Sequence, residues 1–332
     1  MAAAPAPRFH GLDMLRGVAA IFCMLYHVQM EFKVGSGPFL MGFLAVDLFY
    51  AASGYVMARS FASRKAAAGL GDFVAGRFRR LWLPYAVGCL LGAAVVLRAG
   101  WDPARVLPSL ALMLLFLPTP FIGKGVFGLN SPGWTLTFQM GADILHRLAF
   151  SRMSTGALAA LWAVCAVVLW VWTQETQWLW AGTSFGHFAY CVFRTLVPYL
   201  AGILIFRQLR DRTLPVPWWV AQAGLPVLIL GGQALPQPLF QLVFVVLLCP
   251  LLIVASFRFP TNERLCRFAS WLGAFSYPLF TVHMPVLHLF RDNGWPREGA
   301  AVASILLGIA VTAAVKGLPA GWPFVLRRQV TA

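Results

Sequence analysis

The chain has few charged residues. Only 11% of its 332 residues are charged, whereas 60% are hydrophobic. Soluble domains usually carry about 25% charged residues, so this composition excludes an ordinary water-soluble enzyme. Because no long stretch departs from the apolar composition, we expect a single integral membrane domain over 1–332, with no soluble domain.

Cysteine and acidic residues are scarce as well. The six cysteines lie singly, without the CxxC or Cys/His spacing of a metal site, so we expect small packing residues and no bound metal. With 11 acidic against 26 basic residues, the net charge of +15 would on its own suit a nucleic-acid partner. The arginines and lysines, however, lie in short clusters between apolar runs and form no continuous basic face, which excludes nucleic acid.

Apolar runs of membrane-spanning length recur along the whole chain. A transmembrane helix needs about 20 mostly apolar residues, so we predict an all-α polytopic membrane protein with about ten transmembrane helices. One further apolar segment, 105–122, contains Pro108, Pro118 and Pro120, and we expect it to be re-entrant or interfacial. The predicted spans are 12–31, 39–58, 81–98, 133–150, 156–174, 187–206, 216–232, 237–257, 269–290 and 299–318.

The basic clusters predict the orientation, because cytoplasmic loops of membrane proteins are enriched in Lys and Arg. If 105–122 does not cross, the clusters at 147–152, 207–212, 258–267 and 327–328 all face the same side as the richest loop. We therefore expect a multi-pass protein of the bacterial cytoplasmic (inner) membrane, with both termini cytoplasmic and an uncleaved first span. The richest basic loop contains Arg59, Arg64, Lys65, Arg77, Arg79 and Arg80.

The first span carries ionisable residues that are costly inside hydrocarbon and therefore need a reason. Arg16 and His27 are eleven residues apart, which is three helical turns plus about 20°, so both project from one face about 16 Å apart along the axis. This spacing suits a long anionic ligand that enters from the cytoplasm and reacts at its far tip. The alternatives are an interfacial arginine that reaches for water and a histidine hydrogen-bonded within the bundle.

Further ionisable residues lie in later spans. A structural ion pair, such as Asp47 with an arginine, is the alternative to a functional role, and for His146 we favour a structural role. These residues are Asp47, Asp143, His146, Arg194 and His283.

The segment 12–20, Leu-Asp-Met-Leu-Arg-Gly-Val-Ala-Ala, followed by His27, resembles the signature of the acyltransferase 3 family of membrane-bound O-acyltransferases. Further blocks resemble the same family in the same order, and the resemblance covers about 12–318. They are Val-Asp-Leu-Phe-Tyr-Ala-Ala-Ser-Gly-Tyr at 46–55, the basic segment 77–85, Trp-Thr-Leu at 134–136 and the closing block 272–283.

The resemblance implies transfer of an acyl group, commonly acetyl, from acyl-coenzyme A (acetyl-CoA) in the cytoplasm to a hydroxyl of a glycan or another cell-surface or secreted acceptor. Carried onto this sequence, His27 is the general base or a transient acyl carrier, because an imidazole titrates near neutrality. Asp47 would orient this histidine. The residues expected to hold the donor phosphates are Arg16, Arg77, Arg79 and Arg80, and those on the acceptor side are Trp134, Ser276, Tyr277 and His283.

One position departs from the family pattern. Gln139 stands where the family usually has a glutamate. Asp143, four residues on and on the same helix face, is the candidate substitute for the missing carboxylate. Otherwise the enzyme works without that group, or the chain is a non-catalytic family member. A transporter with a buried ionisable relay is the other alternative.

Overall fold

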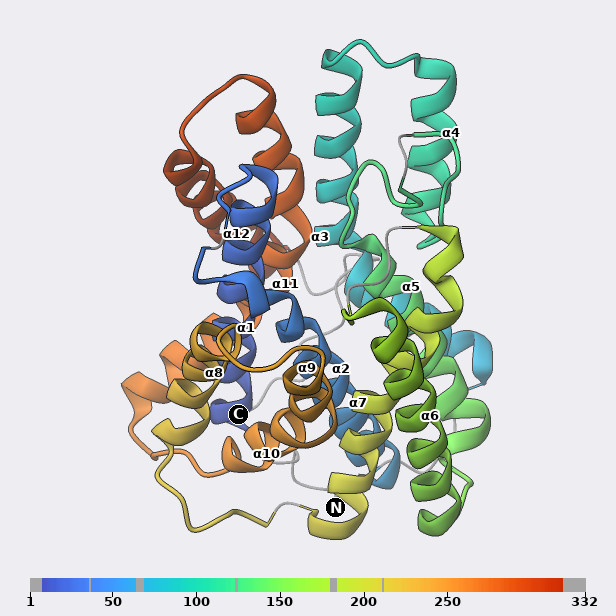
Figure 1. The fold of residues 1–332 in the computed structure, drawn as a ribbon, viewed down its shortest axis with the longest axis vertical. Coiled ribbons are helices and arrows are strands. Elements are labelled where there is room, and N and C mark those ends of the chain that lie inside the picture. Colours follow the sequence, from blue (N-terminus) through green and yellow to red (C-terminus); the bar gives the residue numbers. More distant parts are fainter. Residues whose placement is uncertain are drawn as a thin grey trace.

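The computed structural model describes residues 8–35, 37–63, 69–122, 125–179, 184–210 and 212–318. These residues form helices joined by turns, and no β-strand occurs among them (Figure 1). The all-α prediction is therefore confirmed. Arg64, Lys65, Arg327 and Arg328 of the predicted basic clusters lie outside the described residues.

Twelve α-helices and four short 3-10 or π-helical turns follow one another in the described chain. In order they are α1 (His10–Glu31), η1 (Leu40–Leu44), α2 (Ala45–Ser63), α3 (Leu70–Arg98), α4 (Pro103–Leu114), α5 (Gly133–Leu145), η2 (His146–Phe150), α6 (Thr155–Thr176), η3 (Phe185–His187), α7 (Phe188–Leu209), α8 (Trp219–Gly232), α9 (Leu239–Val243), η4 (Phe244–Leu248), α10 (Cys249–Ala255), α11 (Glu263–Asp292) and α12 (Arg297–Gly317).

Side-chain caps set the start of several of these helices. The Asp102 carboxylate accepts from Ala104 N at 2.9 Å at the start of α4, and Ser154 Oγ accepts from Ala157 N at 3.1 Å at the start of α6. Such caps satisfy backbone N–H groups that the first helical turn leaves without partners.

Six helices are long and apolar enough to cross a membrane, among the residues that the structure describes. The membrane assignment is thus supported, whereas the count of ten spans is not confirmed. Two predicted spans are broken or short, since α5 passes into a π-helical turn at His146 and α8 has only 14 residues, whereas α11 is 30 residues long but carries more polar and charged side chains. The six are His10–Glu31, Leu40–Ala62, Leu70–Arg98, Thr155–Thr176, Phe185–Leu209 and Arg297–Gly317.

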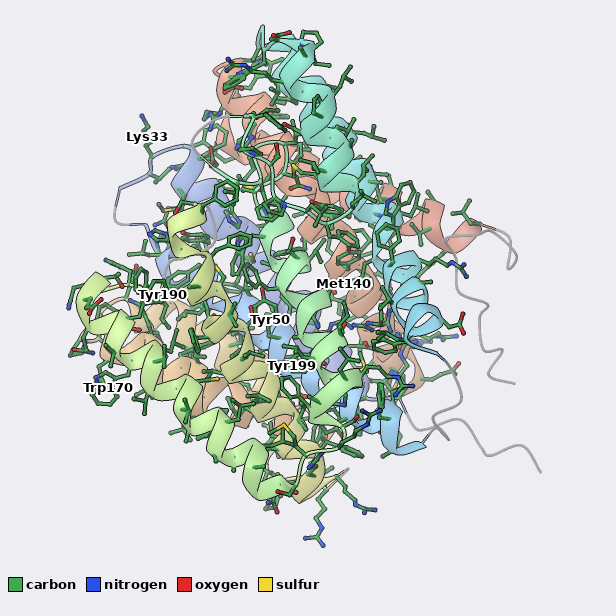
Figure 2. All side chains as sticks on the ribbon, turned by 90° about the vertical axis from the view of Figure 1, so that its right-hand side faces the viewer. Lys33, Tyr50, Met140, Trp170, Tyr190 and Tyr199 are labelled. Carbon is green, nitrogen blue, oxygen red and sulfur yellow. The ribbon has the colours of Figure 1, made fainter. Side chains whose placement is uncertain are left out.

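The surface of α6 is apolar, as a lipid-facing helix requires. Val164, Val167 and Trp170 expose 59%, 63% and 56% of their surface. Figure 2 shows Trp170 at the periphery of the bundle, whereas Tyr50 and Tyr199 lie in its interior. A contiguous apolar surface of this kind is unusual on a soluble monomer and is the norm in a bilayer.

The segment 105–122 folds as half of a short hairpin. Its helix α4 has 12 residues and is about 18 Å long, less than the ~30 Å hydrocarbon core. It packs along the second half of α3, at the top of Figure 1, and near the middle of α3 Trp82 Nε1 donates to Leu114 O at 3.0 Å. The chain then turns at Phe116, which has a φ of 60°. Helix α4 alone is therefore too short to cross, as expected for a non-spanning segment.

Two pairs of closely packed helices organise the centre. Helix α11 runs along α1, where a Cβ on Gly17 would overlap Leu272, and α7 runs along α2, where a Cβ on Gly54 would overlap the carbonyl of Tyr199. Small residues at such contacts let helix backbones approach closely in a membrane. These two pairs carry Arg16, His27, Asp47, Arg194 and His283.

Several arginine-rich helix ends meet at one end of the bundle. Arg207 donates to the carbonyls of Phe150 and Met153 at 2.9 and 2.5 Å, and Tyr55 donates to the carbonyl of Arg210 at 3.1 Å. The ends of α2, η2 and α7 therefore lie together. Which side of the membrane this end faces stays a prediction.

Candidate active site

Helix α1 places Arg16 and His27 on one rigid element. It runs from His10 to Glu31 without a proline, so the eleven residues between the two side chains span about 16 Å. Arg16 lies toward the arginine-rich end of the bundle. His27 lies toward the opposite end, where α1 meets the second half of α11.

His27 forms a hydrogen-bonded pair with His283 of α11. His283 Nε2 lies 3.0 Å from His27 Nδ1, and His283 Nδ1 lies 3.1 Å from the carbonyl oxygen of Leu279. A carbonyl can only accept, so His283 Nδ1 must carry a proton, and in a neutral ring its Nε2 is then the acceptor. His27 Nδ1 therefore donates, which leaves the lone pair of a neutral His27 on Nε2.

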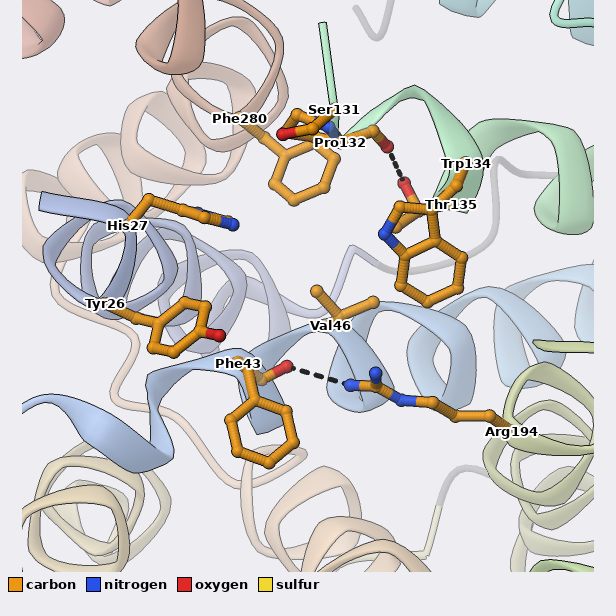
Figure 3. Close-up of a pocket in the computed structure, with 10 residues that line it drawn as sticks. All are labelled: Tyr26, His27, Phe43, Val46, Ser131, Pro132, Trp134, Thr135, Arg194 and Phe280. Atoms are coloured by element: carbon orange, nitrogen blue, oxygen red, sulfur yellow. Dashed lines mark hydrogen bonds between the residues drawn. The ribbon is translucent and has the colours of Figure 1, made fainter. Parts of the chain in front are cut away.

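A cavity of about 40 Å³ lies beside this pair. Figure 3 shows the imidazole of His27 pointing into it, with Trp134 on the opposite wall. The predicted site residue Trp134 thus shares a cavity with His27. A neutral imidazole whose Nε2 faces a cavity can accept a proton from a bound hydroxyl. The lining residues are Tyr26, His27, Phe43, Val46, Ser131, Pro132, Trp134, Thr135, Arg194 and Phe280.

Asp47 does not orient His27, contrary to the role expected from the sequence. Its two carboxylate oxygens accept from Arg194 Nε at 3.3 Å and Nη2 at 3.1 Å, and both side chains are buried. This is the structural ion pair with an arginine that was the alternative to a functional role for Asp47. The group that fixes the His27 ring is His283, which we had expected on the acceptor side.

Asp143 lies at the arginine-rich end, away from His27. Its carboxylate accepts from Arg77 Nε at 2.7 Å and from the hydroxyl of Tyr199 at 3.0 Å. Gln139 donates to the same carboxylate at 3.1 Å, so the expected contact between positions four apart is present. In this structure the carboxylate of Asp143 is therefore the ion-pair partner of Arg77.

The arginines of this end form a group with excess positive charge. Arg16, Arg77 and Arg80 lie within Coulombic range of one another. The carboxylate of Asp13, at 3.7 Å from Arg16, is shared with Arg8 at 2.6 Å. Such a group can bind phosphate oxygens, because guanidinium donors match them in pairs.

A comparison with known families decides what kind of protein this is. A family model described as an acyltransferase domain, acyltransferase 3, matches residues 9–317. The chain belongs to the acyltransferase 3 family. It is also 33% identical over 193 residues to "Protein 2 in picA locus" of Rhizobium radiobacter. The matched region covers 53% of this chain and all of that protein. No solved structure matches the chain.

Three other predicted site residues of this acyltransferase 3 protein lie outside the cavity lining. The hydroxyl of Ser276 donates to Gly273 O of its own helix at 2.7 Å, and the hydroxyl of Tyr277 donates to Leu81 O at 2.6 Å. Arg79 is exposed on α3. Tyr26 and Ser131 could not be recognised from the sequence, because neither is a charged residue of the kind that is costly in a membrane.

Proposed function

We propose that this protein transfers an acyl group, acetyl in the first instance, from acyl-coenzyme A to a hydroxyl of a glycan or another cell-surface or secreted acceptor. Membership of the family supports acyl transfer. The observation that carries the proposal is the neutral His27, whose free Nε2 faces a cavity while His283 holds its Nδ1. The cavity of about 40 Å³ suits a small acyl group such as acetyl.

The donor binds with its phosphates at the arginine-rich end. Arg16, Arg77 and Arg80 are partly accessible to solvent there and exceed their acidic neighbours in charge. The coenzyme's pantetheine arm then runs between the helices toward His27, about 16 Å further along α1. This assigns Arg16 and His27 to the two ends of one extended substrate.

The proton and bond balance of the reaction closes with the two substrates and the histidine. His27 Nε2 takes the proton from the acceptor hydroxyl as its oxygen attacks the thioester carbonyl carbon. The tetrahedral intermediate collapses, the carbon–sulfur bond breaks, and the leaving thiolate receives the proton from His27. The products are the acyl ester and free coenzyme A. In the variant mechanism His27 Nε2 attacks the thioester carbonyl carbon and the carbon–sulfur bond breaks to release the thiolate. The acceptor oxygen then displaces the histidine from the acyl group, and the acceptor's proton passes to the thiolate.

The proposed arrangement in the membrane follows from the charge distribution. We assign the arginine-rich end to the cytoplasm and keep the ten-span topology, with both termini inside, in a bacterial inner membrane. The donor then enters from the cytoplasm and the acceptor reaches the cavity from the opposite side.

Transfer of radiolabelled acetyl from acetyl-CoA by the purified protein tests the proposal, with membranes or extracted surface glycans as the acceptor source. His27→Ala should lower transfer by about 10²–10⁴-fold, the usual contribution of a general base. Wild-type transfer by this variant contradicts the assigned role. Substrate flux in liposomes without any acetyl transfer would instead support the transporter alternative.

A further inference from the structure

Arg194 is a fully buried cation in the wall of the cavity that contains His27. Only 2% of its surface is exposed. It donates to both oxygens of Asp47, to Phe43 O at 3.1 Å and, through Nη1, to Leu179 O at 3.0 Å. A guanidinium has five N–H donors. The fifth, on Nη1, has no acceptor among the residues that the structure describes.

The guanidinium is held rigidly in this position. Its central carbon lies 5.4 Å from the ring centroid of Trp134 and 5.4 Å from that of Phe43. Both rings line the same cavity, and Figure 3 shows Arg194 directed toward it from α7. Asp47 on the far side holds the charge in place, so the position of the donor does not depend on a ligand.

A buried donor without an acceptor needs an explanation, since nearly all buried polar groups in native proteins are paired. The four bonds already made, to α2, to η1 and to Leu179 in the connection after α6, account for a structural role. The remaining N–H belongs to a cation at a cavity that also contains a base. Fixed donors of this kind stabilise the negative oxygen that forms during acyl transfer.

We propose that Arg194 binds the carbonyl oxygen of the thioester and stabilises the oxyanion of the tetrahedral intermediate. The proposal rests on the acyl transfer proposed above. As the acceptor oxygen bonds to the carbonyl carbon, the π electrons move to the carbonyl oxygen and His27 takes the proton. Arg194 donates to that oxygen until the carbonyl re-forms and the carbon–sulfur bond breaks.

The Tyr26 hydroxyl is the competing donor. It also lines the cavity and makes no hydrogen bond to the other residues drawn in Figure 3, but it is neutral, whereas Arg194 carries a full charge. Charge-assisted hydrogen bonds are roughly twice as strong as neutral ones. Tyr26→Phe is therefore the matched control for a substitution of Arg194.

Kinetics of Arg194→Lys provide the first test. The variant keeps the charge opposite Asp47 but loses the planar donor set. We expect kcat to fall about 10²–10³-fold, as on loss of one oxyanion donor, while the affinity for free coenzyme A stays close to wild type. The thermal midpoint in detergent should fall, because a lysine cannot make all four buried bonds of Arg194. A folded variant with wild-type kcat overturns the proposal, as does a Tyr26→Phe variant with the larger loss of kcat.

An infrared measurement keeps the proposal testable if Arg194→Lys does not fold. Acetyl-CoA labelled with ¹³C at the carbonyl is bound to the His27→Ala protein, which retains Arg194 but turns over slowly. The carbonyl stretch should move to lower frequency on binding, and should do so equally after Tyr26→Phe is added. An unshifted band refutes the role of Arg194, whereas the absence of any acetyl transfer by the wild-type protein refutes the proposed function instead.

Discussion

Replacing His283 by alanine tests the proton order of the histidine pair. His27 Nδ1 donates to His283 Nε2 over 3.0 Å, and His283 Nδ1 donates to Leu279 O over 3.1 Å. In His283→Ala the Nδ1–H of His27 loses its histidine acceptor and keeps only the weak contact with Cys23 Sγ at 3.9 Å, so the ring can rotate and move its proton to Nε2. Both changes remove the lone pair that faces the cavity.

The expected loss follows from two contributions. A neutral hydrogen bond contributes about 0.5–1.5 kcal/mol net. Loss of the tautomer preference therefore lowers the fraction of His27 rings with a free Nε2 lone pair by up to about tenfold. A displaced reacting group costs up to about 100-fold more. We therefore expect kcat to fall about 100-fold, within the ~10²–10⁴-fold that complete loss of a base would cost. The KM for acetyl-CoA should stay within about twofold, because the phosphate-binding arginines are untouched.

Two matched variants separate positioning from simple loss of packing. In His283→Gln the amide oxygen can still accept from His27 Nδ1, so activity should recover to within about tenfold of wild type. His288 lies on the same helix, but its Nε2 is 3.5 Å from Glu31 and it is not part of the histidine pair. The substitution His288→Ala should therefore leave kcat unchanged. Acetyl transfer by each purified variant, with its thermal midpoint, is the assay. Wild-type kcat in His283→Ala, with the protein folded, refutes the reasoning.

Further predictions concern the arginine-rich end and α11. Arg16→Ala should raise the KM for acetyl-CoA about tenfold, the value of one charge-assisted hydrogen bond, whereas Arg79→Ala, on another face of α3, should not. In steady-state assays Gln139→Glu should not raise acetyl transfer, because Asp143 already supplies the carboxylate for Arg77 and a second one beside it would repel. Ser276→Ala should retain near wild-type transfer, because this hydroxyl only bonds back to its own helix.

The helical fold could be predicted from the sequence because apolar run length and charge are local properties. The limits appear where helices are broken. The π-helical turn at 146–150, the short α8 and the split helix over 239–255 are not visible in the hydrophobic pattern, which continues through them. Run length therefore predicted apolar segments reliably, but it could not say which of them is one straight helix of spanning length.

The partners of the ionisable residues could not be predicted in the same way. The spacing of Arg16 and His27 follows from one helix and is local. The pairs His27–His283, Asp47–Arg194 and Arg77–Asp143 join residues 256, 147 and 66 positions apart. Which helix lies beside which decides these contacts, and close glycine contacts such as that of Gly17 with Leu272 fix that choice.

The pairing of the charged side chains explains how apolar helices can contain them. It also explains why the groups at the two ends of the bundle have different roles. A charge at the bilayer centre costs at least about 2.5–3.5 kcal/mol. Asp47 and Arg194 offset this cost by pairing, and His27 avoids it because it is neutral in its pair with His283. At the opposite end, Arg16 and Arg80 share few carboxylates with their neighbours. An anionic donor gains most where positive charge is in excess, and a base acts best where its lone pair is uncharged and free. The two requirements are met about 16 Å apart on one helix.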